Sequence, residues 1–423
     1  MGQAETCLRG LVQAERKNLE RMAEVVPVTD DQRLRHCLTD SPWDHQAVVQ
    51  PVAAEADRLL GERCDRCLLI DESSFVKQGK DSVGVARQWC GRLGKVDNCQ
   101  IGVFAVLCHG ERHIPIDARL YLPKQWLDDR RRCRGAGIPA TAMIARSKAQ
   151  HALAMVQQAR TDGPRFAWVG LDGGYGKEPW LLRALGAEGE TFVADIHKSQ
   201  IIYLTDPMPR VPERAAARGR RPGRLQAQTA GIRVEQWLAQ QASTAWQRVI
   251  LRDSTRGKLT VEALNQRVWP WDGEEAAAHC WHLTVRREII APNEIKFTLS
   301  NAAAETPLER LAFMPGQRFW VERSFQDAKS TCGMADYQVR RWSGWHHHIA
   351  IVMIAMLFMA EERIARRDTE PLLSCADIVA LLKHFLPKPA VTREHVIEQM
   401  RFRHRQRQAS IDSAYAIQAQ RLE

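Results

Sequence analysis

The sequence lacks a secretory leader and lacks any apolar run long enough to cross a bilayer. Residues 1–20 are polar and helix-like, unlike the apolar segment of a signal peptide. The longest apolar run, residues 349–360, is shorter than the roughly 20 residues that a membrane helix needs. We therefore expect a cytoplasmic protein without a membrane partner, in which residues 349–360 form a buried helix.

Cysteine is present but follows no regular pattern. The chain has 11 cysteines, an odd number, so a disulfide framework is not indicated and reduced thiols are expected. Cys64 and Cys67 form one close pair, and Cys90 and Cys99 follow. Because a structural zinc site usually repeats a close pair and none follows here, the pattern does not favour zinc.

Positive charge is in excess. The 423 residues carry a formal net charge of +10 and a sequence pI of about 9.2. Such a balance favours a polyanionic partner, either nucleic acid or a membrane surface. Hydrophobic residues make up 45% of the chain and charged residues 26%, which is ordinary for a globular protein, and the length indicates two or three domains.

Residues 1–60 show helical periodicity. Apolar residues recur near helical spacing from Leu8 to Val25, Thr29 can cap a second helix, and Pro42 suits the first turn of a third. Short helices with charged surfaces are typical of a DNA-binding head, although a plain helical bundle explains the pattern equally well. We take residues 1–60 as a helical N-terminal domain that binds DNA.

Residues 61–200 alternate between strand-like and helix-like segments. Strand patterns come first, and a helix, a strand, a helix and a strand follow, at residues 67–70, 100–108, 112–122, 147–160, 166–171, 178–186 and 191–196. Three antiparallel-looking strands followed by this alternation predict a mixed α/β core.

A basic, proline-rich stretch interrupts this core. Residues 207–224 contain four prolines, and six arginines lie between Arg210 and Arg224. The stretch is either a solvated linker or a basic loop on a phosphate backbone, with Arg220 and Arg221 as DNA contacts. Residues 246–252, 258–263, 280–286 and 296–300 then look like strands, so 201–300 is expected to be a mostly β insertion.

A helix is expected at residues 318–329. At about 100° per residue, Arg318, Glu322, Phe325 and Lys329 fall within roughly 60° of each other on its surface. A carboxylate between two cations suits a site shared by metal ions and phosphate, although an ordinary surface ion pair has the same spacing. Residues 301–367 would complete the core, and 368–423 would form a polar helical tail.

Two acidic residues each follow an apolar strand pattern. Asp71 and Asp172 stand where a mixed sheet presents functional side chains to a cleft, but such residues are also common helix caps and turn residues. If Glu322 joins them, three carboxylates offer the oxygen ligands that hard divalent cations need.

The chain resembles a known family in several longer motifs. The sequence is similar to DDE transposases of the insertion-sequence 701 group, related to the insertion-sequence 4 superfamily, at residues 69–75 (LIDESSF), 83–88, 98–104, 120–124, 167–176 (AWVGLDGGYG), 299–302 and 337–346. The resemblance covers about residues 5 to 365. It implies an RNase H-like catalytic core with a β-rich insertion, and magnesium-dependent cutting of DNA at element ends followed by joining to target DNA.

The resemblance also implies roles for individual residues. Asp71, Asp172 and Glu322 would be the catalytic metal ligands, holding two Mg²⁺ ions for which Mn²⁺ can substitute. In the family signature Tyr-x2-Arg-x3-Glu-x6-Lys, Arg318 and Lys329 match and would contact phosphate, while the tyrosine position holds Pro315. The resemblance further implies that the N-terminus is shorter than in the family by about one helical segment.

The same resemblance implies two binding partners. One is double-stranded DNA, both the terminal inverted repeats and the target, and the other is a second copy of the chain in a homodimer on DNA. The expected location is the bacterial cytoplasm, in association with the nucleoid.

Tryptophan is abundant, with 13 residues. Most are expected in the core, but Trp269 or Trp271 in the β insertion could stack on an unpaired base near the cut. Two other functions remain open. One is a non-catalytic DNA-binding derivative, and the other is a metal-dependent nuclease without strand transfer.

Overall fold

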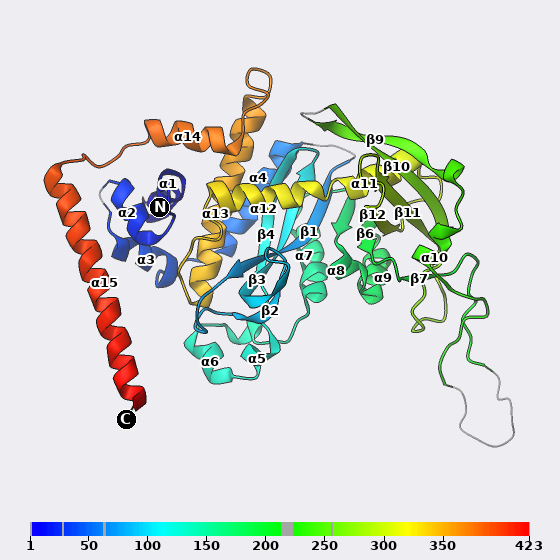
Figure 1. The fold of residues 1–423 in the computed structure, drawn as a ribbon, viewed down its shortest axis with the longest axis horizontal. Helices are drawn as coiled ribbons and strands as arrows, with labels where there is room; N and C mark the ends of the chain where they lie inside the picture. Colours follow the sequence, from blue (N-terminus) through cyan, green and yellow to red (C-terminus); the bar gives the residue numbers. More distant parts are fainter. Residues whose placement is uncertain (1, 28, 62–64, 213–222, 255–256, 423) are drawn as a thin grey trace.

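One large mixed sheet runs through the molecule, with helices packed on it (Figure 1). The computed structural model describes residues 2–27, 29–61, 65–212, 223–254 and 257–422. Within these residues the main sheet has ten strands in the order β2-β3-β1-β5-β6-β12-β11-β10-β9, with β4 also paired to β3. They are β1 (Cys67–Val76), β2 (Ala86–Cys90), β3 (Lys95–His109), β4 (Arg112–Leu120), β5 (Trp168–Leu171), β6 (Phe192–Ile196), β9 (Gln247–Ser254), β10 (Gly257–Val268), β11 (Trp281–Glu288) and β12 (Ile295–Ser300).

The centre of the sheet is parallel and its flanks are antiparallel. β1 pairs parallel with β5, and β5 pairs parallel with β6. β3 pairs antiparallel with β1, β2 and β4, and β12 pairs antiparallel with β6. The predicted mixed α/β fold is therefore confirmed. A separate pair of short strands, β7 (Ile201–Ile202) and β8 (Ile232–Arg233), lies outside the main sheet.

Helices cover both faces of the sheet because alternate strand residues point to opposite sides. In β1, Leu68 and Ile70 pack with α7 and α9, whereas Leu69 and Phe75 pack with α12 and α13. The longer helices are α1 (Gly2–Gln13), α3 (Asp31–Thr39), α4 (Gln46–Leu60), α7 (Lys148–Asp162), α9 (Pro179–Ala187), α11 (Leu308–Gly316), α12 (Phe319–Thr331), α13 (Trp342–Ala365), α14 (Cys375–Phe385) and α15 (Arg393–Leu422). The shorter ones are α2 (Leu19–Val25), α5 (Lys124–Leu127), α6 (Arg130–Gly135), α8 (Gly173–Gly176) and α10 (Val234–Ala239).

Helices α1, α3 and α4 pack on α13. The ring nitrogens of His347 lie 2.9 Å from the carbonyl oxygen of Leu38 and 2.8 Å from that of Trp43. The Trp43 ring stacks on the same imidazole with 3.9 Å between ring centroids. The N-terminal helices thus share a continuous apolar core with α12 and α13. At the other end of the chain, α15 extends along one side of the molecule (Figure 1).

Several element boundaries differ from the sequence expectations. β1 does not end at Asp71 but continues to Val76, because β3 pairs with every residue of that polar segment. α4 begins at Gln46, later than Pro42. The strands expected in residues 201–300 are present, and β12 joins them directly to β6 of the main sheet. No helix in the described ranges is long and apolar enough to cross a membrane.

Candidate active site

Three carboxylates stand at one level across the three parallel strands. The pairing of β1, β5 and β6 aligns Ile70 with Leu171 and Leu171 with Ala194. The residue that follows each of these three positions is an aspartate: Asp71, Asp172 and Asp195. Because side chains alternate along a strand, all three lie on the face that α12 covers.

Asp71 is held in a low-dielectric environment. Its side chain is largely buried, and its Oδ1 accepts a hydrogen bond of 2.7 Å from the backbone N–H of Glu72. Burial raises the pKa of Asp71 to about 7, Arg318 opposes this rise, and the charge of Asp172 adds to it. A buried carboxylate of this kind is costly unless a cation accompanies it.

Asp172 is fixed by the turn that follows β5. It caps α8, and its Oδ1 accepts hydrogen bonds from the backbone N–H groups of Gly174 at 2.9 Å and Tyr175 at 3.2 Å. The turn lies tightly on β6, since a Cβ atom at Gly176 would approach the carbonyl oxygen of Asp195 to 1.9 Å. Asp172 therefore has the cap role that its sequence position allowed, and it also faces the same pocket as Asp71.

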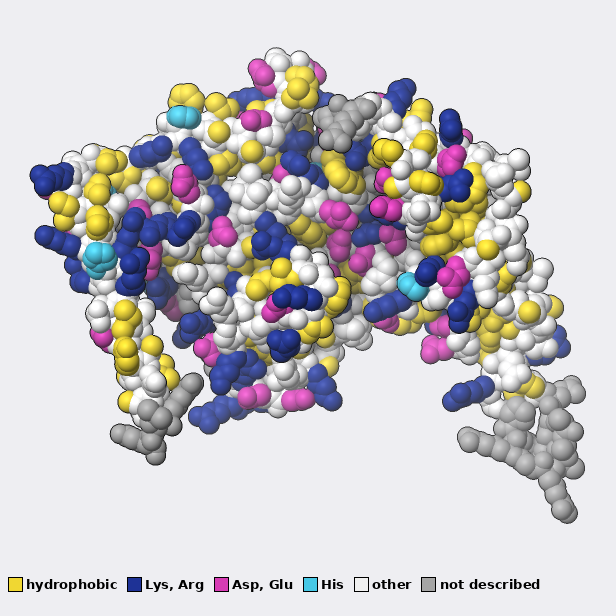
Figure 2. Space-filling view, in the orientation of Figure 1, with side chains coloured by type: hydrophobic (Ala, Val, Ile, Leu, Met, Phe, Trp, Pro, Cys, Tyr) yellow, Lys and Arg dark blue, Asp and Glu magenta, His cyan; other side chains and the backbone are white. Residues whose placement is uncertain are grey.

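The expected helix face exists and lines that pocket. Glu322 is exposed in the first turn of α12, and Arg318, Phe325 and Lys329 line the same cavity with it, as their spacing predicted. The cavity, which we call the carboxylate pocket, has a volume of about 430 Å³. Figure 2 shows acidic side chains gathered near the middle of this face of the molecule, with basic side chains spread around them.

Arg318 lies between two of the aspartates. Its Nη1 contacts Oδ2 of Asp195, and its Nη2 lies 3.4 Å from Oδ2 of Asp71. The side chain crosses β5 at Gly170, where a Cβ atom would lie 3.9 Å from Cγ of Arg318. Burial acts to lower the pKa of Arg318, but the facing carboxylates outweigh burial and the pKa is raised. Its charge is therefore directed at carboxylates rather than left open to a phosphate.

A second pair of cations lies at the other side of the pocket. Lys329 stands 5.8 Å above the Phe75 ring centroid, and Arg92 lies in the turn after β2. Burial lowers the pKa of Lys329, and the nearby charge of Arg92 lowers it further. In the described part of the chain, neither cation forms an ion pair.

The donor chemistry of the pocket fits a hard divalent cation, because every acidic donor is a carboxylate oxygen. Within the described ranges, however, no three side chains among His, Cys, Asp and Glu lie close enough together to hold one ion. Asp71 and Asp172 stand on neighbouring strands, and Glu322 faces them from the helix. Asp71, Asp172 and Glu322 thus line one pocket without forming a closed ligand cluster.

The remaining expected site residues lie elsewhere or are not described. Trp271 lines a different cavity, beside Arg183 and Glu275, and its indole N–H donates to the carbonyl oxygen of Glu275 at 2.8 Å. Trp269 forms a backbone bridge with Tyr203. Neither tryptophan lines the carboxylate pocket. Arg220 and Arg221 fall outside the described residues, as does Cys64.

The structure also identifies neighbours that sequence reasoning missed. Asp195 was the last polar residue of an expected strand, but only the adjacency of β5 and β6 reveals its alignment with Asp172. Trp89 and Arg92 line the carboxylate pocket from a hairpin whose first strand, β2, has no clear alternation of apolar residues. Pro315 is buried inside α11, one turn before Arg318.

Comparisons with known proteins agree with these features. The family model for DDE superfamily endonucleases matches residues 2–258. The probable transposase for insertion sequence element IS701 from Microchaete diplosiphon is 24% identical over 331 residues, which cover 78% of this chain and 74% of that protein. The NurA nuclease structure from Sulfolobus solfataricus aligns with 9% identity and a TM-score of 0.27 over 67% of this chain and 86% of that chain. Structural similarity this low carries no argument about the fold.

Proposed function

Because the chain belongs to the DDE superfamily of endonucleases, we propose that it acts as a DNA transposase. Membership of this superfamily agrees with the family expected from the sequence motifs. In the proposed reaction the protein cuts DNA at the inverted-repeat ends of an insertion sequence and joins the 3′-OH ends to target DNA. The observation that carries the proposal is the meeting of Asp71, Asp172 and Glu322 at one pocket.

The proposed core is RNase H-like. Support comes from the central order β3-β1-β5-β6, in which neighbouring parallel strands carry two of the carboxylates and a later helix carries the third. Strands β9 to β12 lie between Asp172 and Glu322 in the sequence, as the proposed β insertion requires. The N-terminal helices would be the DNA-binding domain, and synapsis of two ends would use a homodimer on DNA.

Asp71, Asp172 and Glu322 would hold two Mg²⁺ ions, or Mn²⁺ as a substitute. Bound divalent ions would supply charge stabilisation for the attacking and leaving oxygens of a phosphodiester. Since the ligand cluster is open in the present structure, binding requires that α12 bring Glu322 toward the strands or that DNA contribute further oxygen ligands.

The chain's own cations would position the DNA. Lys329, which forms no ion pair among the described residues, would contact a phosphate next to the scissile bond. Arg318 would act mainly through the carboxylates, because it bridges Asp71 and Asp195 across β5. Such contacts add salt-dependent affinity rather than base specificity.

The test is a joining assay with a labelled duplex that carries the terminal repeat, a supercoiled target plasmid and Mg²⁺. We expect metal-dependent cutting and transfer of label to the plasmid. Asp71→Ala, Asp172→Ala and Glu322→Ala should each abolish both steps while DNA binding persists. Glu309→Ala is the matched control, since Glu309 is an exposed glutamate in the first turn of α11, outside the pocket.

Each outcome of this assay separates the candidate functions. A nuclease without strand transfer would cut the duplex and leave the plasmid unlabelled. A non-catalytic DNA-binding derivative would do neither and would still bind the duplex. Full activity in any one of the three alanine variants would remove that residue from the proposed site.

A further inference from the structure

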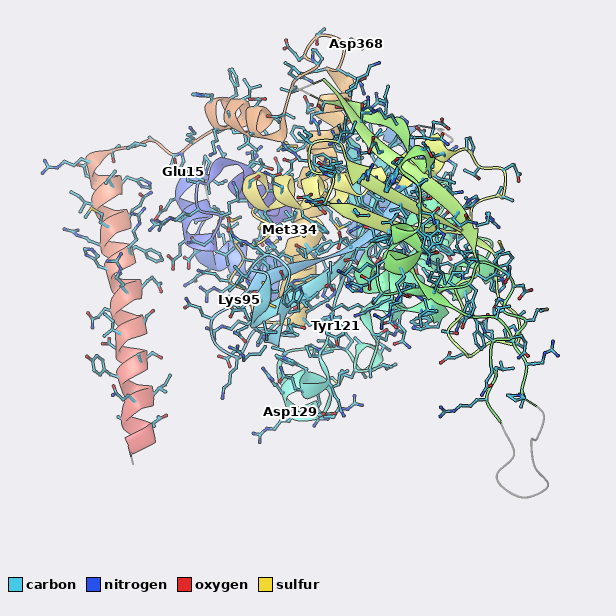
Figure 3. The ribbon with its side chains drawn as sticks, turned by 45° about the vertical axis from the view of Figure 1, so that its right-hand side comes forward. Glu15, Lys95, Tyr121, Asp129, Met334 and Asp368 are labelled. Atoms are coloured by element: carbon cyan, nitrogen blue, oxygen red, sulfur yellow. The ribbon has the colours of Figure 1, made fainter. Side chains whose placement is uncertain are left out.

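One wall of the carboxylate pocket is a hairpin that presents an exposed tryptophan. Trp89, in β2, is 56% exposed and lines the pocket together with Arg92. Figure 3 labels Lys95, which begins the second strand of this hairpin. Trp89 pairs with Val96 of β3, and Asp71 pairs with Phe104 of the same strand. Because Val96 and Phe104 are an even number of residues apart, Trp89 and Asp71 lie on the same sheet face.

The tryptophan belongs to an apolar surface beside the pocket. Its cross-strand partner Val96 is 51% exposed, and Leu93 in the connecting turn is 43% exposed. Single exposed apolar side chains need no explanation, but adjacent ones next to a charged cavity mark a surface that a ligand covers. A tryptophan whose ring is open to solvent offers a flat face on which another flat group can stack.

The cations of the pocket lie between this surface and the carboxylates. Arg92 is exposed and Lys329 is half-buried, and the charge of Arg92 disfavours the charged form of Lys329. Among the described residues no carboxylate pairs with either of them. Two like charges left together at a pocket wall favour an anion between them, and a phosphate diester supplies one charge and two oxygens.

Resting on the proposed transposase function, we infer that Trp89, Arg92 and Lys329 form a subsite for one unpaired nucleotide beside the scissile phosphate. The base stacks on Trp89, and its phosphate lies between Arg92 and Lys329. The nucleotide is unpaired because an indole on a strand cannot reach the face of a base that remains stacked in a duplex. The aromatic that handles this base is therefore Trp89, and not Trp269 or Trp271.

The inference is tested by binding alone, in EDTA, so that no cutting is needed. The probes are a blunt DNA duplex and the same duplex with a short single-stranded overhang whose first unpaired base is 2-aminopurine. Fluorescence anisotropy gives both affinities, and 2-aminopurine quenching reports stacking. We expect the wild-type protein to prefer the overhang and to quench the probe. Trp89→Ala should lose roughly tenfold in affinity for the overhang, together with the quenching, while Trp89→Phe retains most of both.

Arg92 is tested through salt dependence. Arg92→Ala should weaken binding of the overhang duplex more than binding of the blunt duplex, and should reduce the slope of log K against log salt for the overhang duplex by about 1. Arg87→Ala is the matched control, because Arg87 is an exposed arginine of the same hairpin that does not line the pocket. Phe385→Ala removes an exposed aromatic from α14, 82% exposed, and controls for non-specific loss of apolar surface.

The outcomes distinguish the subsite from the function on which it rests. If the wild-type protein binds both duplexes equally, or if Trp89→Ala keeps the preference and the quenching, the subsite is wrong. The proposed function then stands or falls separately, on metal-dependent joining. If the wild-type protein binds neither duplex, the subsite and the transposase proposal both fail. Unchanged melting temperatures of the variants exclude misfolding as the cause of any loss.

Discussion

Two pockets of similar volume differ in how their charges are satisfied. The carboxylate pocket has a volume of about 430 Å³, and a pocket between α4, β4 and α7 has about 380 Å³. In the second pocket one oppositely charged pair meets: Arg119 lies 3.2 Å from Asp117 and also donates to the carbonyl oxygen of Ala154. Asp117 further accepts a 2.7 Å hydrogen bond from the backbone N–H of Ala118.

The carboxylate pocket leaves comparable groups without such partners. In the described part of the chain, Glu322, Arg92 and Lys329 form no ion pair, although carboxylates and cations line the same cavity. Charges that pair with one another stabilise the fold, whereas a pocket that also leaves a carboxylate and two cations without ion pairs can bind ligands of both signs. We therefore infer that the second pocket stabilises the fold and that the carboxylate pocket binds ligands.

The largest expected effect tests the carboxylate pocket. Glu322→Gln keeps the size of the side chain but removes the charge that a divalent ion needs. We expect metal-dependent cutting to fall at least about a thousand-fold, because metal ions contribute several kcal/mol of transition-state stabilisation. Thermal stability should stay unchanged, since Glu322 is exposed and forms no ion pair among the described residues. Loss of stability together with activity would make Glu322 a structural residue.

The next prediction tests the second pocket. Arg119→Ala leaves the half-buried Asp117 without its cation and should lower the free energy of unfolding by roughly 2 kcal/mol, measured by denaturant titration. Arg131→Ala, at an exposed position of α6, is the control and should have little effect. Cutting activity of folded Arg119→Ala should match the wild type. An activity loss at full stability would reverse the assignment of the two pockets.

Local spacing predicted one wall of the carboxylate pocket correctly. The shared face of Arg318, Glu322, Phe325 and Lys329 depends only on helical geometry, which the sequence contains. The strand leading to Asp172 was also predicted, because its apolar run is continuous. The end of β1 was not, since Glu72, Ser73 and Ser74 resemble a turn. In the structure their backbone pairs with β3 and they line the pocket.

Long-range packing determined what sequence spacing could not supply. Asp195 becomes relevant only through the pairing of β6 with β5, and Trp89 only through the hairpin that brings β2 to the pocket. Trp269 and Trp271 follow β10 and pack near Tyr203 instead. Which tryptophan meets the carboxylates depends on how strands separated in sequence are ordered, and composition carries no information on that order.

Acid should weaken the second pocket through His151. Burial lowers the pKa of His151 to about 4, and the charges of Arg119 and Arg146 add to this. In the unfolded chain His151 binds a proton near pH 6.5, whereas in the folded chain it stays neutral at that pH. The contribution of neutral His151 to the free energy of unfolding is therefore present above pH 6.5 and is lost as the pH falls. Between pH 7 and pH 5 the free energy of unfolding should fall by roughly 2 kcal/mol, because one pKa unit corresponds to about 1.4 kcal/mol. In His151→Gln the free energy of unfolding should fall by that much less over the same pH range. If the wild type and the variant show the same pH dependence of unfolding, His151 is not the group responsible.

The smallest expected effect concerns Asp195, which keeps Arg318 from neutralising the metal ligands. Without this carboxylate, the guanidinium retains Asp71 as its remaining acidic contact and competes with a divalent ion for it. Asp195→Asn should therefore weaken Mn²⁺ binding about tenfold in a calorimetric titration, since one added net charge nearby is worth on the order of 1 to 2 kcal/mol. Adding Arg318→Gln removes the competing cation and should restore the affinity. If Asp195→Asn alone binds Mn²⁺ as tightly as the wild type, Arg318 stays in place without Asp195 and is held by its packing over Gly170.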